Sequence, residues 1–188
     1  MIKIPESFES VVDYLGYYVK PLLEETRAQL LSSMEILYRA PFAEVVDFEE
    51  TKPYGTKVYQ VRVNYWRNRF SDRSKEPYKT LPGDFLVLAN AKPETLSDLE
   101  RVGGSWTFLS VTKVTEDGED GDGDGSSSSY FKVKASKDLK LEFETQSSLF
   151  VVYLANMTSN NRIWKALHML RNPTILNRVL CVGSMVSS

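Results

Sequence analysis

The chain contains one cysteine, Cys181, and one histidine, His168, among 188 residues. A single cysteine excludes an internal disulfide bond, which is typical of proteins in a reducing compartment. A catalytic dyad of these two residues would need both at one site, but the sequence places them on separate helical segments. We therefore interpret both as structural or surface residues and expect neither a catalytic residue nor a metal ligand in this chain.

Long apolar runs and a strong net charge are also missing. No run approaches the ~20 residues of a membrane span, and the N-terminus lacks the apolar centre of a signal peptide. The formal charge of −2 excludes a uniformly basic nucleic-acid binder but allows a local basic patch. These features predict an intracellular protein.

No Gly-x-x-x-x-Gly-Lys-Ser/Thr motif occurs, so we expect the chain alone to be non-catalytic towards ATP. The run Asp120-x-Asp122-x-Asp124-Gly125 is similar to the start of an EF-hand loop. Its twelfth position is Phe131, where a calcium site needs a bidentate glutamate. We therefore expect no cofactor here and interpret residues 116–129, rich in Asp, Glu, Gly and Ser, as a disordered acidic loop.

Helical periodicity is found at both ends of the chain. In residues 1–41, apolar side chains recur at helical spacing after a candidate N-cap at Ser7, and Pro21 predicts a kink or restart. In residues 156–188, Asn156 or Ser159 could cap a helix with Ile163, Trp164, Leu167 and Leu170 on one face. A further helical segment begins at Pro173. We expect the two ends to pack as an antiparallel stalk that buries Trp164.

Strand patterns fill residues 42–155. The run from Phe85 to Ala89 follows a Pro-Gly turn and is apolar on both faces, which predicts a strand covered on both sides. Residues 57–66, 106–115 and 130–135 alternate between polar and apolar, and so do Leu141 and Phe143. Residues 93–100 could form one or two helical turns. The sequence thus predicts an α+β fold, a small antiparallel β-barrel flanked by the helical stalk.

One segment concentrates positive charge. From Lys57 to Lys79 there are seven Lys or Arg residues against two acidic ones, interleaved with aromatic side chains. Arginine with aromatic rings suits single-stranded nucleic acid, because bases stack while phosphates pair with cations. A solvated loop whose rings enter the barrel is the alternative. The candidate contact residues are Arg62, Tyr65, Trp66, Arg67, Arg69, Arg73, Lys75 and Lys79.

Three segments resemble a known family. They are Tyr78-Lys-Thr-Leu-Pro-Gly-Asp-Phe-Leu-Val-Leu, then Ser105-Trp-Thr-Phe-Leu-Ser-Val-Thr-Lys-Val, and Leu149-Phe-Val-Val-Tyr-Leu-Ala-Asn-Met-Thr-Ser-Asn-Asn-Arg-Ile-Trp-Lys-Ala-Leu. Together with the order of helical arm, barrel and returning arm, they are similar to the stalk and barrel accessory region of plant senataxin-like (MAGATAMA 3 type) superfamily 1 helicases.

The resemblance implies a non-catalytic accessory domain of a nuclear RNA or DNA helicase. Such a domain would position or regulate single-stranded nucleic acid on the ATPase motor of the same polypeptide. ATP and Mg²⁺ would belong to the motor domains, which this chain does not contain. A protein–protein interaction module of the same large protein is the alternative, and in either case the resemblance implies a piece of a longer polypeptide.

Overall fold

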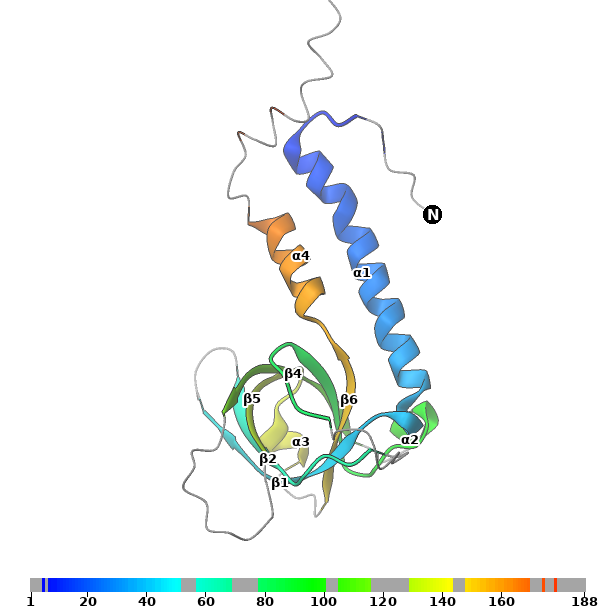
Figure 1. Cartoon of the computed structure of the whole chain (residues 1–188), viewed down its shortest axis with the longest axis vertical. Helices are drawn as coiled ribbons and strands as arrows, with labels where there is room; N and C mark the ends of the chain where they lie inside the picture. The colour runs from blue at the N-terminus through cyan, green and yellow to red at the C-terminus, as the bar shows by residue number, and fades with distance from the viewer. Residues whose placement is uncertain are drawn as a thin grey trace, which may run out of the picture. The chain divides into compact units, whose positions relative to one another are not determined.

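The computed structural model describes residues 5, 7–51, 57–68, 78–100, 105–115, 129–143, 148–169, 174 and 178. The chain divides into two compact units. One combines its two ends, Met1–Gln29 and Ser159–Ser188, and the other is Leu30–Thr158. Figure 1 gives the element labels.

The second unit is a closed antiparallel β-barrel, as the sequence predicts, so the chain has an α+β fold. The strands follow one another around the barrel in the order β1-β2-β5-β4-β3-β6. Their bounds are β1 Phe42–Glu50, β2 Val58–Val63, β3 Asp84–Ala89, β4 Trp106–Thr115, β5 Ser129–Ala135 and β6 Leu149–Asn156. The interior is filled by alternate side chains of these strands, among them Tyr59, Val61, Leu109, Phe131 and Val133.

Strand β3 is covered on both faces, which explains its continuous apolar sequence. Leu86 and Leu88 point into the barrel core. Val87 and Ala89 belong to a second apolar cluster outside the wall. That cluster includes Met34 at the end of helix α1 (Val11–Glu35), Leu37 of the short 3₁₀ helix η1 (Leu37–Arg39) and Leu99 of helix α2 (Leu96–Glu100).

Leu141 and Phe143, for which the sequence predicts alternating strand positions, belong to helix α3 (Leu139–Phe143) instead. Leu139 and Phe143 are four residues apart, so one helical turn places both on the same face. Both are essentially inaccessible and complete the barrel core. Asp138 accepts a hydrogen bond from the Lys140 backbone N–H at 3.1 Å, which caps the first turn.

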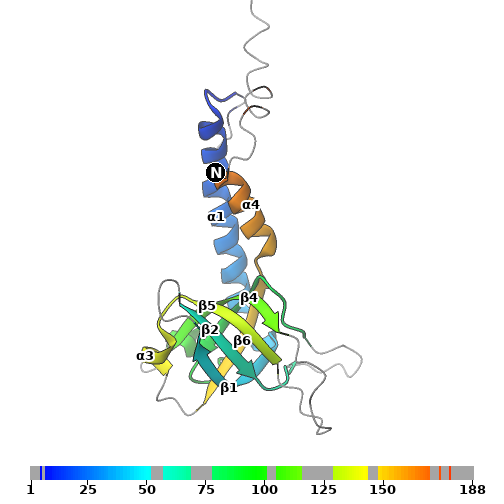
Figure 2. The ribbon, with the colours of Figure 1, turned by 90° about the vertical axis from the view of Figure 1, so that its left-hand side faces the viewer.

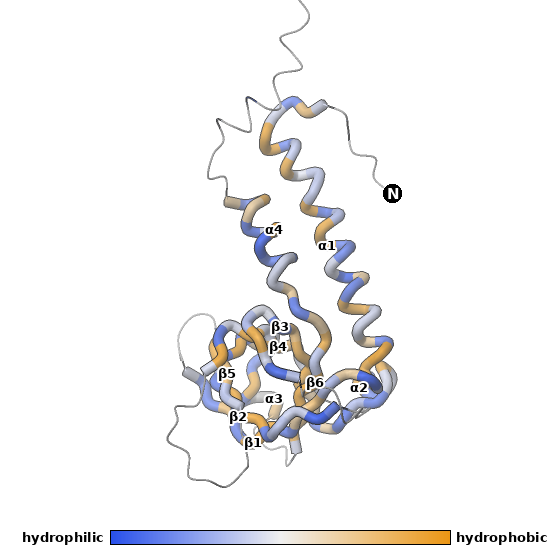
Figure 3. The backbone as a smooth tube through the Cα atoms, in the orientation of Figure 1, coloured by the Kyte–Doolittle hydropathy of each residue, from blue (hydrophilic) through white to orange (hydrophobic). Residues whose placement is uncertain are grey.

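Helix α1 runs without interruption through Pro21, so the chain does not restart there. Its N-cap is Ser10 rather than Ser7, because the Ser10 hydroxyl accepts the Asp13 backbone N–H at 3.0 Å. Hydrophilic and hydrophobic residues alternate along the helix (Figure 3). Among the described residues of the unit formed by the two ends of the chain, only Val11 and Leu22 have buried apolar side chains.

Helix α4 (Thr158–His168) lies beside α1 and runs in the opposite direction (Figures 1 and 2). The Asn160 side-chain amide donates to the Thr26 hydroxyl at 2.8 Å. Contrary to the sequence expectation, Trp164 is not buried: it is 38% exposed and stacks on His168, with the ring centroids 4.0 Å apart. No residue of α4 is buried. The helix that the sequence predicts after Pro173 lies outside the described residues, apart from residues 174 and 178.

No helix among the described residues is both long and apolar enough to cross a membrane.

Candidate nucleic-acid interface

The predicted contact segment begins on β2 and continues past its end. On β2, Tyr59, Val61 and Val63 point into the core, so Arg62 points outward. Its guanidinium lies over the Tyr130 ring of β5, 5.9 Å from the centroid, and donates to the Tyr130 hydroxyl at 3.4 Å. Arg62 is thus held in place by an aromatic neighbour while its charge stays at the surface.

Tyr65 and Arg67 present an exposed aromatic ring and a cation side by side. The Tyr65 side chain is 57% exposed, and the Arg67 guanidinium lies 5.1 Å from its ring centroid. The Arg67 backbone is fixed by two hydrogen bonds with Phe42, of 2.8 and 3.0 Å. Such a pair offers one surface on which a base could stack and a charge for a phosphate.

Trp66, between them, faces inward and is a correction to the predicted contact set. It is 5% exposed, and its indole N–H donates to the buried Thr80 hydroxyl at 2.9 Å. Its ring also meets Tyr78 edge-on at 4.5 Å. A buried ring cannot stack on a base, so Trp66 belongs to the core.

Residues 67–79 separate Trp66 from Thr80 in the sequence. The hydrogen bond between Trp66 and Thr80 brings the two ends of this segment together. Lys79 lies between two inward-facing residues, Tyr78 and Thr80, and is itself exposed. The structure therefore gathers Tyr65, Arg67 and Lys79 at the base of this segment. The remaining predicted contact residues, Arg69, Arg73 and Lys75, lie outside the described residues.

Lys92 is a neighbouring cation that the sequence did not single out. Its ammonium group lies 4.2 Å from the centroid of the Phe42 ring, and Phe42 pairs with Arg67. Lys92 lies outside the basic segment in sequence, and the bridge between residues 42 and 67 connects the two through Phe42. No composition or spacing signal would have found it.

A buried polar cluster fixes the segment that carries Lys79. The Asp84 carboxylate is 1% exposed. It accepts hydrogen bonds from the Tyr78 hydroxyl, from the Leu81 backbone N–H at 2.7 Å and from the Asn156 amide at 2.7 Å. Burial, and next the hydrogen bond to Asp84, raise the pKa of the Tyr78 phenol above its usual value. The cluster makes the Leu81-Pro-Gly-Asp turn a rigid support.

The same turn is joined to the start of α4. Gly83 has a φ of +90°, a conformation that favours glycine. A Cβ atom at this position would collide with the Thr158 side chain. The Pro82 carbonyl accepts from the Thr158 hydroxyl at 3.2 Å, and Asn156 caps the helix by accepting the Thr158 backbone N–H at 3.0 Å. Ser159, the alternative cap that the sequence offered, lies inside the helix, so the prediction of Asn156 is the one confirmed.

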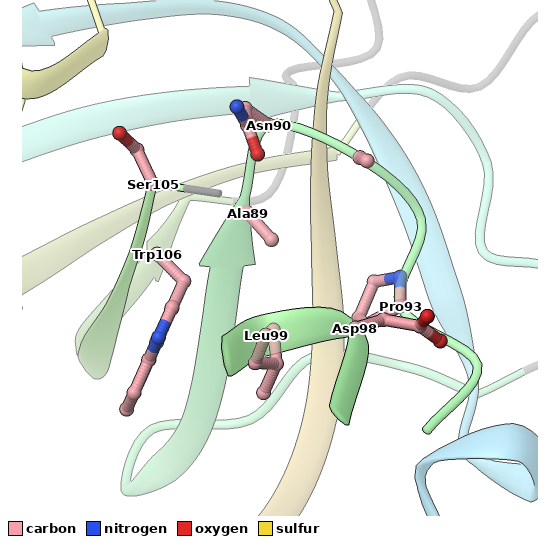
Figure 4. A pocket seen from close by; sticks show the side chains of 8 residues that line it. Ala89, Asn90, Pro93, Asp98, Leu99, Ser105 and Trp106 are labelled. Atoms are coloured by element: carbon pink, nitrogen blue, oxygen red, sulfur yellow. The ribbon is translucent and has the colours of Figure 1, made fainter. Parts of the chain in front are cut away.

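A small pocket between the end of β3, the start of β4 and α2 offers no substrate site. Its lining includes Ala89, Leu99, Ser105 and Trp106 (Figure 4). It has room for about one water molecule. Among the described residues there is also no group of three or more His, Cys, Asp or Glu that could hold a metal ion.

A family model matches residues 1–187, and its description is a domain of unknown function, DUF6469. The chain belongs to this family. No curated protein matches the chain. Within the DUF6469 domain, the surface best suited to binding is formed by the exposed residues Tyr65, Arg67 and Lys79 together with the half-buried Arg62. We call it the β2-end surface.

Proposed function

We propose that this DUF6469 domain is a non-catalytic accessory domain that binds single-stranded RNA or DNA weakly through its β2-end surface. The observation that carries the proposal is the pairing of Tyr65 and Arg67, an exposed ring with a guanidinium 5.1 Å from its centroid. Further positive charge comes from Lys79, which is next to the buried Thr80 that bonds Trp66, and from Arg62, which is held against the Tyr130 ring.

The wider setting of the proposal is a senataxin-like helicase in the nucleus. The order of helical arm, barrel and returning arm, and the Leu-Pro-Gly-Asp segment, support it through their resemblance to that class. In this setting the barrel would position a strand for motor domains of the same polypeptide, which would bind ATP and Mg²⁺. The chain itself would contribute binding and no chemistry.

The test is fluorescence anisotropy of labelled single strands, oligouridine and oligodeoxythymidine, across a salt series. We expect dissociation constants in the micromolar range or weaker, as is usual for non-specific contacts, with affinity falling as salt rises. Arg67→Glu combined with Lys79→Glu should abolish binding. Lys20→Glu combined with Lys165→Glu, which changes two exposed lysines of the other unit, is the matched control.

A protein-interaction module is the second candidate. It is favoured by exposed apolar side chains on α4 and directly after it: Ile163 is 48% exposed, Trp164 38% and Met169 58%. No binding of either strand at low salt, together with recovery of a defined protein partner that Trp164→Ala weakens, would favour this candidate over nucleic-acid binding.

A further inference from the structure

The outer face of β2, β5 and β4 is basic, although no contiguous sequence motif marks it. Phe131 and Val133 of β5 point into the core, so Tyr130, Lys132 and Lys134 point outward. The pairing of strands places Lys132 between Gln60 of β2 and Lys113 of β4, and Tyr130 between Arg62 and Thr115. Directly paired residues share one face of a sheet. Three lysines and Arg62 therefore share this face.

A β-bulge is what brings Lys113 to this side. Val111 points into the core, so strict alternation would turn Lys113 inward as well. The register shifts between Val111 and Lys113, which leaves Thr112 and Lys113 both exposed and turns Val114 towards the core. Bulges commonly redirect a side chain in this way at functional sites.

The arrangement is unfavourable for folding alone. Lys113 and Lys132 are direct cross-strand partners, and like charges in such a pair are destabilising. Among the described residues, no ion pair includes Lys113, Lys132 or Lys134. On the next strand, β1, the exposed acidic residues Asp47 and Glu49 pair directly with Arg62 and Gln60 of β2, and neither pairs with a lysine of this face. An anion from outside the barrel would relieve this repulsion.

We infer that this face, formed by Arg62, Lys113, Tyr130, Lys132 and Lys134, binds the phosphate backbone of a single nucleic-acid strand. The inference rests on the proposed function and extends it to a second surface. Tyr130 beside Arg62 favours nucleic acid over an acidic peptide, because a ring beside a guanidinium can serve a base and its phosphate together. Arg62 joins this face to the β2-end surface, since Tyr65 and Arg67 follow it along the chain.

The acidic segment from Glu116 to Asp124 follows β4 directly in the sequence. A tethered acidic segment competes with a bound anion for any cation that it can reach. We therefore expect affinity to be low and strongly dependent on salt.

The experiment compares full-length variants by anisotropy, with labelled oligouridine of about 4 and about 16 nucleotides, the usual range of site sizes. The test variant carries Lys113→Gln, Lys132→Gln and Lys134→Gln. Each lost phosphate contact lowers the slope of log affinity against log salt by about 0.7. We expect the slope for the longer strand to fall by about 2 and the affinity to fall by about tenfold. The 4-nucleotide strand, which the β2-end surface alone can hold, should be affected less.

Two control variants separate charge from fold. Lys20→Gln, Lys137→Gln and Lys165→Gln remove the same charge from exposed positions elsewhere and should leave the slope unchanged. Lys113→Arg, Lys132→Arg and Lys134→Arg together keep the charge and should retain binding. If the triple glutamine variant does not fold, as judged by circular dichroism, the pair Lys132→Gln and Lys134→Gln replaces it, with an expected slope change of about 1.4.

The outcomes distinguish the inference from the function on which it rests. If the wild type binds and the triple variant at positions 113, 132 and 134, or the pair that replaces it, binds equally well, the inference is overturned. The β2-end surface then remains as the site. Absence of wild-type binding would overturn both. Displacement of the strand by polyglutamate in the wild type, but not in the triple variant, with the strand's own affinity unchanged by the triple substitution, would assign the face to an acidic polypeptide instead.

Discussion

Strands β3 and β6 are covered on both sides, whereas β2 and β5 carry core side chains only towards the barrel interior. On the first pair, Val87 and Val152 lie outside the barrel wall but are fully buried beneath the second apolar cluster. On the second pair the corresponding outward positions hold Gln60, Arg62, Lys132 and Lys134. The two walls share a core and a hydrogen-bonded ladder. They differ in the outward side chains that a partner could contact.

The outward residues of β3 and β6 maintain the fold, whereas those of β2 and β5 are available to contact a partner. A wall covered on both sides has little tolerance for polar substitution, because its outward positions are also core positions. The wall with one solvated face can change its outer side chains at little cost in stability. We therefore place both proposed binding surfaces on the solvated wall and its continuation.

The strongest test of this comparison inserts a lysine into each wall. Val87→Lys would bury an unpaired ammonium group, so we expect it to lower the free energy of unfolding by more than about 4 kcal/mol or to prevent folding. Gln60→Lys, on the outer face of β2, should change it by less than about 0.5 kcal/mol. Urea melts followed by circular dichroism measure both. Equal losses would show that the two walls do not differ in this way.

Removal of one hydroxyl should weaken the buried cluster that supports the Leu-Pro-Gly-Asp turn. Tyr78→Phe deletes the hydrogen bond to the Asp84 carboxylate, so we expect a loss of about 1.5–3 kcal/mol at neutral pH. The measurement is again a urea melt, with Tyr65→Phe, an exposed tyrosine, as the control.

The same variant has a signature at alkaline pH. The folded state holds the Tyr78 proton more tightly than the unfolded chain does, because the pKa of this phenol is raised by burial and by Asp84. Its contribution to stability is therefore complete below about pH 10 and falls as the pH rises further. The difference between wild type and Tyr78→Phe should shrink above that pH. A difference that is constant across the titration would contradict the raised pKa.

Trp164→Ala tests the other unit of the molecule, and we expect a loss of only about 1 kcal/mol. The ring is 38% exposed and has His168 stacked against it, so less apolar area returns to water than when a core tryptophan is removed. A loss of about 3 kcal/mol or more, the usual cost in a core, would restore the buried position that the sequence pattern predicts.

Replacement of the acidic segment should have the smallest effect on stability. Thr115 and Tyr130 are direct partners, so an Asn-Gly turn in place of residues 116–129 can join the strands as a two-residue hairpin. Shortening a loop changes its closure entropy by only about 0.6 kcal/mol per halving. We expect unchanged or slightly higher stability, and tighter binding of oligouridine at low salt. A variant that fails to fold would show that the segment is structural.

The sequence predicted the barrel because its strands carry two clear signals. Residues 106–115 alternate, and Phe85 to Ala89 are apolar on both faces, so each pattern matches its covering in the structure. Leu141 and Phe143 were misassigned to a strand because two apolar residues at a spacing of two fit that pattern. Leu139 and Phe143, four residues apart, fit one face of a helical turn equally well. Five residues are too few for periodicity to decide.

The binding surface was harder to predict than the fold. Tyr65 and Trp66 are adjacent aromatic residues, and continued alternation from Val61 and Val63 would have turned Tyr65 inward. The chain leaves that alternation after β2, so Trp66 is buried and Tyr65 is exposed. Likewise, the bulge that exposes Lys113 depends on the register of β4 against β5. Both features depend on pairing between distant segments, which periodicity does not specify.

The contact between Gly83 and Thr158 has a consequence for comparing members of this family. A Cβ at position 83 is excluded both by the local φ and by the Thr158 side chain, and Asn156 and Thr158 both donate to the Pro82 carbonyl. Pro-Gly-Asp at residues 82–84 and Asn-x-Thr at residues 156–158 therefore act as one unit divided between two places in the chain. In an alignment of DUF6469 domains, substitutions in the two tripeptides should covary, and their joint presence should identify distant members in which the rest of the barrel sequence has diverged.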